Sequence, residues 1–191
     1  PAAVFANFHW VESMPFWGMI EAVREKVGDI RAKWMTRSRN ITIFPNLQFN
    51  DSTSLVMRTY IPHGPKLTEM KVYSFAPINE PDDLRAKRVR QHEDFFNSSG
   101  MATPDDTICY ADCHEGYLSF PGEYLQSFER GMATMIHGPD EEAKELGMVP
   151  ETSLYGNFMD QGETSYHGPY REWSRLMRAG HNRDQTLAAA E

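Results

Sequence analysis

The chain has 191 residues, of which 40% are hydrophobic and 24% are charged, the balance of one soluble globular domain or a large part of one. Its formal net charge of −8 disfavours nucleic acid as a partner, because phosphate binding needs clustered Lys and Arg. No apolar run is long enough for a transmembrane helix, and the first residues lack the basic and apolar regions of a signal peptide. The missing initiator Met fits a processed protein or a piece of a longer chain.

The first half of the chain predicts one helix followed by three strands. After an irregular aromatic start, apolar residues recur at helical spacing, and then come segments rich in strand-forming residues. Pro45 lies inside the first of these segments, where it implies an edge position or a bulge. The expected elements are a helix over residues 17–34 and strands over 40–50, 54–61 and 67–76.

The second half predicts mainly helices. The helix over residues 80–96 is basic in its middle, and we expect that charge run to be a solvated face. A loop of small residues leads to a helix that ends near residue 116, and short strands follow near 132–136 and 154–158. The closing helix, 163–177, carries one aromatic stripe that predicts core packing, made of Tyr166, Tyr170, Trp173 and Met177.

Taken together, this order of elements predicts an α+β fold in which an antiparallel β-sheet is covered by helices. Residues 1–180 are expected to form one domain or part of one. Residues 181–191 are polar and rich in Ala, so we expect a flexible C-terminal tail there.

The adjacent carboxylates Asp105 and Asp106 are the most informative local feature. They follow a loop of small residues and open a helix, with Thr103 as the expected N-cap and Pro104 at the first helical position. A carboxylate held in a first helical turn is a good ligand for a cation. Acidic residues are also common at ordinary helix starts, and capping is the commoner role for such a pair taken alone.

The two cysteines, Cys109 and Cys113, are four residues apart on the same expected helix. That spacing rarely forms a disulfide, so it indicates a reducing compartment and a cytoplasmic protein. Together with His114 they would make half of a zinc site, but no second Cys or His pair follows at zinc spacing.

Four segments in order resemble the catalytic domain of the Rieske non-haem iron aromatic ring-hydroxylating dioxygenases, in the C-terminal part of the alpha (large) subunit. The resemblance runs from about residue 30 to residue 178 and keeps the order and spacing of the family. The segments are Ile43-Phe44-Pro45-Asn46, Arg58-Thr59-Tyr60-Ile61-Pro62-His63-Gly64-Pro65 with Thr68-Glu69, the loop from Ser98 to Asp106, and Gly162-Glu163-Thr164-Ser165-Tyr166-His167-Gly168-Pro169-Tyr170-Arg171-Glu172-Trp173.

The resemblance implies a helix-grip, START-like fold and a mononuclear Fe(II) site built from two His and one carboxylate. The position of the carboxylate ligand is Asp106, and Asp105 would be a neighbouring or capping group. The resemblance also implies a set of substrate-lining positions, and for each of them ordinary core or loop packing is the alternative. None of these positions is basic, which favours a neutral hydrocarbon substrate. These positions are Phe96, Ala102, Asn40, Ser38 and Phe49.

The resemblance also implies parts that this sequence does not contain. The Cys-x-His and Cys-x-x-His pairs of a [2Fe-2S] Rieske cluster are absent, and residues 1–37 contain only His9 where the family has its two iron-binding His. We therefore expect a C-terminal portion of an alpha subunit that is inactive alone. The parent would use O₂, an aromatic substrate, and electrons from NAD(P)H through a reductase and often a ferredoxin, in an alpha-subunit trimer with or without a beta subunit.

Three alternatives stay open at this point. The chain is a non-enzymatic helix-grip carrier of a hydrophobic small molecule, which needs the cavity but not Asp106. It has an interaction or structural role, with aromatic surface forming an interface. Or it holds its own metal site, built from Asp106, His114 and another His.

Overall fold

The computed structural model describes residues 2–7, 17–52, 54–119, 128–154 and 163–188, with side chains described within 17–180. The chain forms two compact units. The first consists of residues 6–40 and 48–126 and is called the sheet–helix unit below. The second consists of residues 1–5, 41–47 and 127–191 and is called the C-terminal unit.

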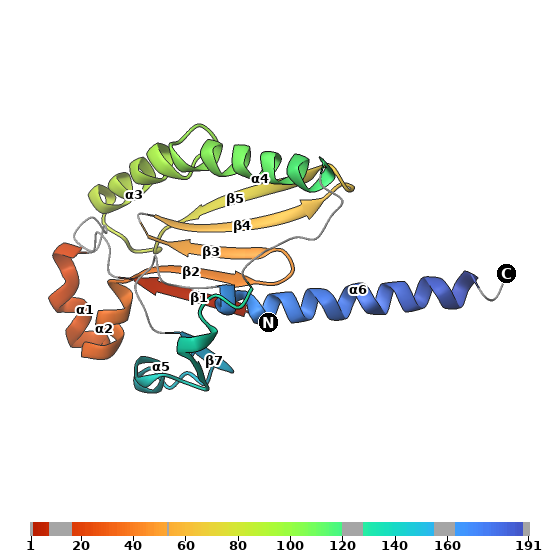
Figure 1. Ribbon diagram of the computed structural model, residues 1–191. Helices are drawn as coiled ribbons and strands as arrows, with labels where there is room; N and C mark the ends of the chain where they lie inside the picture. The colour runs from red at the N-terminus through yellow and green to blue at the C-terminus, as the bar shows by residue number, and fades with distance from the viewer. Residues whose placement is uncertain (1, 8–16, 53, 120–127, 155–162, 189–191) are drawn as a thin grey trace. The chain divides into compact units, whose positions relative to one another are not determined.

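Five strands form one sheet in chain order (Figure 1). Connections of three residues or fewer between β2, β3 and β4 require antiparallel neighbours, and β4 pairs antiparallel with β5 in a register that sets Arg58 opposite Val72. The predicted antiparallel meander, and with it the α+β fold class, is confirmed. The strands are β1 (Ala2–Asn7), β2 (Ser38–Ile43), β3 (Leu47–Asp51), β4 (Leu55–Pro62) and β5 (Thr68–Phe75).

The single strand expected over residues 40–50 is wrong, because the chain turns back at residues 44–46 and forms the separate strands β2 and β3. Pro45 lies in this turn and not in a bulge. A proline has no N–H to donate to a strand ladder, so it suits a turn better than the middle of a strand. The strand β1, in the segment expected to be irregular, was not predicted.

The helix expected over residues 17–34 is interrupted. It consists of η2 (Trp17–Met19), α1 (Ile20–Val27) and α2 (Asp29–Met35). Gly28 separates α1 from α2 with a φ of +82°, a conformation that an L side chain rarely adopts. The apolar periodicity continues across this glycine, which is why the pattern alone did not reveal the break.

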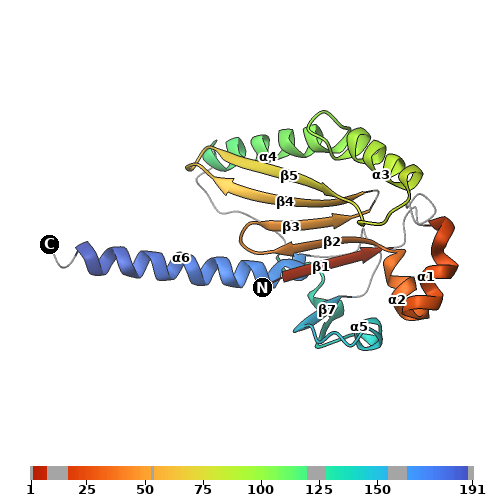
Figure 2. The ribbon, with the colours of Figure 1, turned by 180° about the vertical axis from the view of Figure 1, so that it is seen from behind.

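Two consecutive helices, α3 (Asp82–Phe95) and α4 (Ala102–Ser119), confirm the helices predicted in this region. They follow one another along the β4–β5 side of the sheet, as Figure 1 and the reverse view in Figure 2 both show. The basic run on α3 is only partly a solvated face. Arg88 is buried and pairs with the buried carboxylate of Glu80, with an Nη2–Oε1 distance of 2.6 Å.

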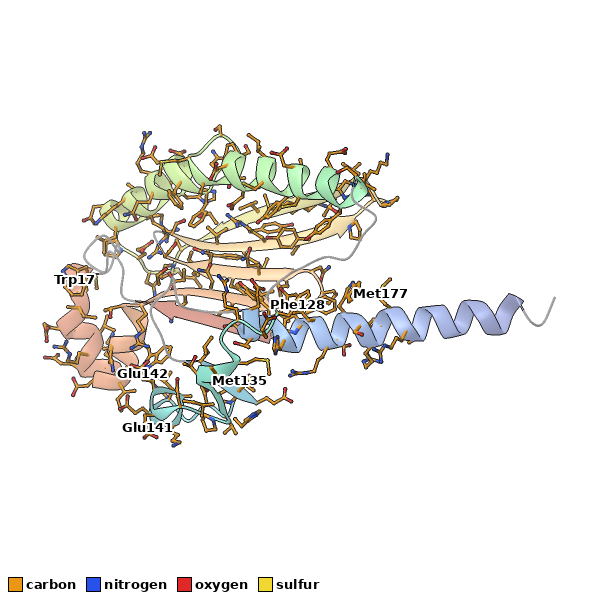
Figure 3. All side chains as sticks on the ribbon, in the orientation of Figure 1. Trp17, Phe128, Met135, Glu141, Glu142 and Met177 are labelled. Atoms are coloured by element: carbon orange, nitrogen blue, oxygen red, sulfur yellow. The ribbon has the colours of Figure 1, made fainter. Side chains whose placement is uncertain are left out.

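The C-terminal unit contains a two-stranded antiparallel sheet, one short helix and one long helix. Met135 of β6 pairs with Leu154 of β7, and residues 155–158 of the strand expected there lie outside the described residues. Figure 3 shows Glu141 and Glu142 in the first turn of α5, which Asp140 caps by accepting a hydrogen bond from the Ala143 N–H. The elements are η3 (Met132–Thr134), β6 (Met135–His137), α5 (Glu141–Glu145), β7 (Thr152–Leu154), η4 (Glu163–Tyr166) and α6 (His167–Ala188).

The helix α6 is longer than expected, because it continues past residue 177 to Ala188. Its first turns contact Phe128, whose ring packs edge-to-face on that of Tyr170 with centroids 5.3 Å apart. Figure 3 shows where Phe128 lies, at the beginning of α6. The aromatic stripe is expected to pack in the core, and this is wrong for Trp173 and Met177. In the part of the chain that the structure describes, both residues are more than half exposed.

Candidate metal-ligand site

The loop between α3 and α4 fixes where the predicted site residues lie. The Met101 N–H donates to the Asp94 carbonyl, and the buried Thr103 hydroxyl donates to the Phe96 carbonyl at 2.8 Å. Thr103 is therefore not the N-cap that the sequence predicts, since α4 already begins at Ala102. Its side chain instead ties the first turn of α4 to the end of α3.

The two adjacent carboxylates point in different directions. Asp105 lies exposed in the first turn of α4, where the helix dipole favours an acidic residue. Asp106 lies one residue later and is turned toward the sheet, with 45% of its side chain exposed. Its Oδ2 is 3.9 Å from Nη1 of Arg58, so the carboxylate of Asp106 is close to a cation without forming a short hydrogen bond to it.

Arg58 is buried in the middle of β4 and was not predicted as a site residue. Its guanidinium carbon lies 5.1 Å from the centroid of the Phe96 ring, within the range of a cation–π contact. Its Nη1 is also 3.5 Å from Oε1 of Gln48, which accepts a 2.8 Å hydrogen bond from the Tyr60 hydroxyl. The available signal was an Arg placed among strand-forming residues, in Leu55-Val56-Met57-Arg58-Thr59-Tyr60.

Side-chain pairs show which predicted lining residues share a face of the sheet. Asn50 donates to Asn40, so these two residues lie on one face together with Ser38 and Gln48. Since Gln48 contacts Arg58 and Tyr60, this is also the face that Asp106 and Phe96 approach.

Phe49 lies on the opposite face. It alternates with Gln48 and Asn50 along β3, and its neighbour Asp51 pairs with Arg39 on that other side. The structure therefore brings Phe96, Asp106, Ser38 and Asn40 to one face and leaves Phe49 away from it. Ala102, half-buried in the first turn of α4, is close in sequence to Asp106 and Thr103.

Two titratable groups near Arg58 have shifted pKa values. Burial lowers the pKa of His92, opposed by the charge of Glu93 and assisted by the Arg58 cation. Burial raises the pKa of Tyr60, although the nearby Arg58 acts in the opposite direction. Both shifts favour the neutral side chains of His92 and Tyr60.

A complete metal site within the chain has no support among the described residues, where no three His, Cys, Asp or Glu side chains gather. His114 is eight residues from Asp106 on α4, about 12 Å along the helix axis. Cys109 and Cys113 are exposed free thiols. His9 lies outside the described residues. The half-exposed carboxylate of Asp106 fits one oxygen ligand of an iron centre, with the remaining ligands to be provided elsewhere.

In the described part of the chain, no helix combines the length and the apolar character that crossing a membrane requires.

Comparison with known proteins shows the family to which this chain belongs. Residues 11–178 match the model of the family described as ring hydroxylating alpha subunit (catalytic domain). The chain is 35% identical over 183 residues to the toluate 1,2-dioxygenase subunit alpha of Pseudomonas putida, covering 95% of this chain and 39% of that protein. It is 37% identical over 170 residues to the 2-halobenzoate 1,2-dioxygenase large subunit of Burkholderia cepacia, covering 88% and 36%.

A third relative is the anthranilate 1,2-dioxygenase large subunit of Acinetobacter baylyi, 33% identical over 165 residues, which are 83% of this chain and 33% of that protein. The chain thus spans between a third and two fifths of the length of these relatives. Since the family model covers residues 11–178, and these relatives agree with it, the chain belongs to the ring-hydroxylating alpha-subunit family and lies within its catalytic domain.

Proposed function

We propose that this chain is part of an oxygenase component that inserts O₂ into an aromatic ring, by cis-dihydroxylation, at an Fe(II) site in which Asp106 is the carboxylate ligand. The observation that carries the proposal is the orientation of Asp106. Of the two adjacent carboxylates, Asp106 is turned toward the sheet face that Phe96 and Arg58 occupy, whereas Asp105 is exposed. Membership of the family supports an enzyme over a non-enzymatic carrier.

The two imidazole ligands of the proposed site come from a part of the parent protein outside this chain. When bound, Fe(II) provides the redox chemistry that activates dioxygen. In this proposal Asp106 binds the metal. The buried ring of Phe96 forms an apolar wall that excludes water and orients the aromatic ring of the substrate. Ala102, Ser38 and Asn40 are proposed as further lining residues, and Phe49 is not, because it lies on the other face of the sheet.

For the substrate we propose an aromatic carboxylate. The relatives at 33–37% identity are named for toluate, 2-halobenzoate and anthranilate, each a benzoate derivative. The sequence favours a neutral hydrocarbon only because none of the predicted lining positions is basic. That reason no longer holds, because Arg58 is buried beside Asp106.

We further propose that this chain works within a longer parent subunit. That parent carries the [2Fe-2S] Rieske cluster, receives electrons from NAD(P)H through a reductase and often a ferredoxin, and assembles as a trimer in the cytoplasm, with or without a beta subunit. Support comes from α4, where Thr103 is the only one of 18 residues that is buried among the described residues. Ile108 and Leu118 are more than half exposed, as expected of a helix that another segment covers.

The test is to replace each carboxylate in the intact parent subunit. Asp106→Ala should remove the mononuclear iron and abolish diol formation from benzoate or a methylbenzoate, while the visible absorbance of the Rieske cluster is retained. Asp105→Ala is the matched control and should keep both iron and turnover. Normal iron content in Asp106→Ala would refute the ligand assignment and return the carrier to consideration.

A further inference from the structure

We propose that Arg58 is the positioning residue of Asp106: its buried guanidinium holds the carboxylate in the orientation from which it binds iron. This inference rests on the proposed function, because it assigns Arg58 a role at the same site. It goes beyond that function by naming a residue on the sheet that controls a ligand on a helix.

The Arg58 cation is buried, and its burial costs free energy unless a counter-charge is near. Arg58 lies on the same strand face as Val56, which is fully buried, and only 6% of the Arg58 side chain is exposed. A buried charge is strongly unfavourable unless it is paired. The carboxylate that the structure pairs with Arg58 is that of Asp106, so each group is the electrostatic partner of the other.

The geometry of the pair between Arg58 and Asp106 contrasts with that of Arg88, another buried arginine of this unit. Arg88 binds Glu80 through three contacts of 2.6–3.1 Å, and both side chains are almost fully buried. Arg58 approaches Asp106 only to 3.9 Å, and nearly half of the Asp106 side chain is exposed. The Arg88 pair is closed, whereas the Asp106 carboxylate keeps oxygen lone pairs free for a further cation.

Arg58 itself is held in place by the residues around it. The strand β4 pairs with β5 on one side, and the guanidinium lies over the Phe96 ring and beside Gln48. Its Nε and Nη2 are buried and have no hydrogen-bond partner among the described residues. The cation is therefore fixed by packing and has donors to spare, so a small movement of Asp106 would let it form a direct hydrogen bond.

Donors that contact a metal-ligating carboxylate affect both metal affinity and activity. Ligating carboxylates are usually oriented by a neighbouring donor, and loss of that donor typically costs about 10–100-fold in metal affinity or activity. The same spare donors would also suit the carboxylate of an aromatic acid. We favour the positioning role because the contact that the structure contains is the one to Asp106.

The test uses the intact parent subunit with its Rieske cluster. Arg58→Met removes the charge, Arg58→Lys keeps the charge without the planar fork, Arg88→Met is the matched loss of a buried arginine, and Asp106→Asn tests the ligand itself. Two quantities are measured without substrate: the affinity of the apo site for Fe(II) under anaerobic conditions, and the EPR spectrum after nitric oxide is added to the reduced protein. The third quantity is the KM for benzoate during turnover.

We expect Arg58→Met to weaken Fe(II) binding about tenfold or more and to change the EPR spectrum, with Arg58→Lys intermediate in both. Arg88→Met should leave both unchanged. If Arg58→Met does not fold, the EPR spectrum of Arg58→Lys decides, and a wild-type spectrum overturns the proposal.

Three other results would also overturn it: unchanged iron affinity and spectrum in Arg58→Met, a rise only in KM for the aromatic acid, or an equal loss of iron in Arg88→Met. Asp106→Asn distinguishes a failure of the proposed function from a failure of the positioning role. If Asp106→Asn keeps its iron, the proposed function is wrong. If Asp106→Asn loses iron while Arg58→Met does not, only the positioning role is wrong.

Discussion

The hydroxyl of Thr103 donates a 2.8 Å hydrogen bond to the carbonyl of Phe96, seven residues earlier in the chain. This bond is buried and joins the first turn of α4 to the residue that follows α3. Asp106 lies one turn after Thr103, so the bond places the carboxylate of Asp106 and the ring of Phe96 in one rigid frame. Both then meet Arg58 on the sheet.

Thr103→Val should therefore destabilise the protein although the change in volume is small. It removes the donor and leaves the Phe96 carbonyl without this partner, which costs about 1–3 kcal/mol of unfolding free energy. Urea unfolding monitored by circular dichroism measures the loss. The control is Thr107→Val, because the Thr107 hydroxyl bonds the Pro104 carbonyl in an exposed position and its loss should cost less than about 0.5 kcal/mol. Equal losses in the two variants would refute the role given to Thr103.

Gly100→Ala should disturb the loop between α3 and α4. A Cβ at this position would lie 2.7 Å from the carbonyl oxygen of Phe95, so the backbone must shift. We expect a loss of about 1–3 kcal/mol, within the usual range for a disruptive substitution. Gly116→Ala, inside α4 with open space around its Cβ, should instead stabilise by up to about 1 kcal/mol. Unfolding curves that move in the same direction for both variants would contradict this prediction.

Removing one partner of the buried pair of Glu80 and Arg88 should cost far more stability than breaking an exposed pair on α3. Glu80→Ala leaves the Arg88 guanidinium buried without its counter-charge, and we expect a loss of about 3–5 kcal/mol. Asp94→Ala breaks the exposed contact to Arg90 and should cost less than about 1 kcal/mol. Thermal and chemical unfolding of the two variants provide the comparison. A small effect of Glu80→Ala would mean that the Arg88 side chain can reach water.

Much of the fold could be predicted from local patterns. The strands β4 and β5 and the helices α3 and α4 follow from period-2 and helical spacing bounded by turn residues. The errors occur where one residue changes the backbone without changing the apolar pattern. Gly28 takes a positive φ between two helical segments, and Pro45 ends a strand that its neighbours would continue.

The candidate site was predicted only in part, for a different reason. Asp106 and Phe96 lie within a motif, so their positions follow from a resemblance along the chain. Arg58 depends on which strand residue lies opposite the start of α4, which spacing along the chain does not reveal. Phe49 and Asn40 lie on opposite faces of the sheet. The face of each follows from two side-chain pairs, Asn40 with Asn50 and Arg39 with Asp51, which the sequence alone does not reveal.

The pKa shift of His92 predicts how stability depends on pH. Burial holds the pKa of His92 in the folded protein below its ordinary value of 6.5, and the nearby Arg58 cation acts in the same direction. Near pH 6.5 and below, the unfolded chain therefore binds a proton that the folded protein resists. The stability that this neutral imidazole contributes is present above pH 6.5 and is lost as the pH falls toward the folded pKa.

We expect His92→Gln to flatten the pH dependence of the unfolding free energy between pH 7.5 and 5.5, because the variant has no group to titrate at this position. Urea unfolding at several pH values measures the slope for both proteins, and an NMR titration of the His92 ring reports its pKa directly. The Glu93 carboxylate opposes the shift, so Glu93→Gln should lower the pKa of His92 further. Parallel pH profiles for the wild type and His92→Gln, or a His92 pKa above 6.5, would contradict the prediction, because a half-buried imidazole near Arg58 binds a proton less readily than one in the unfolded chain.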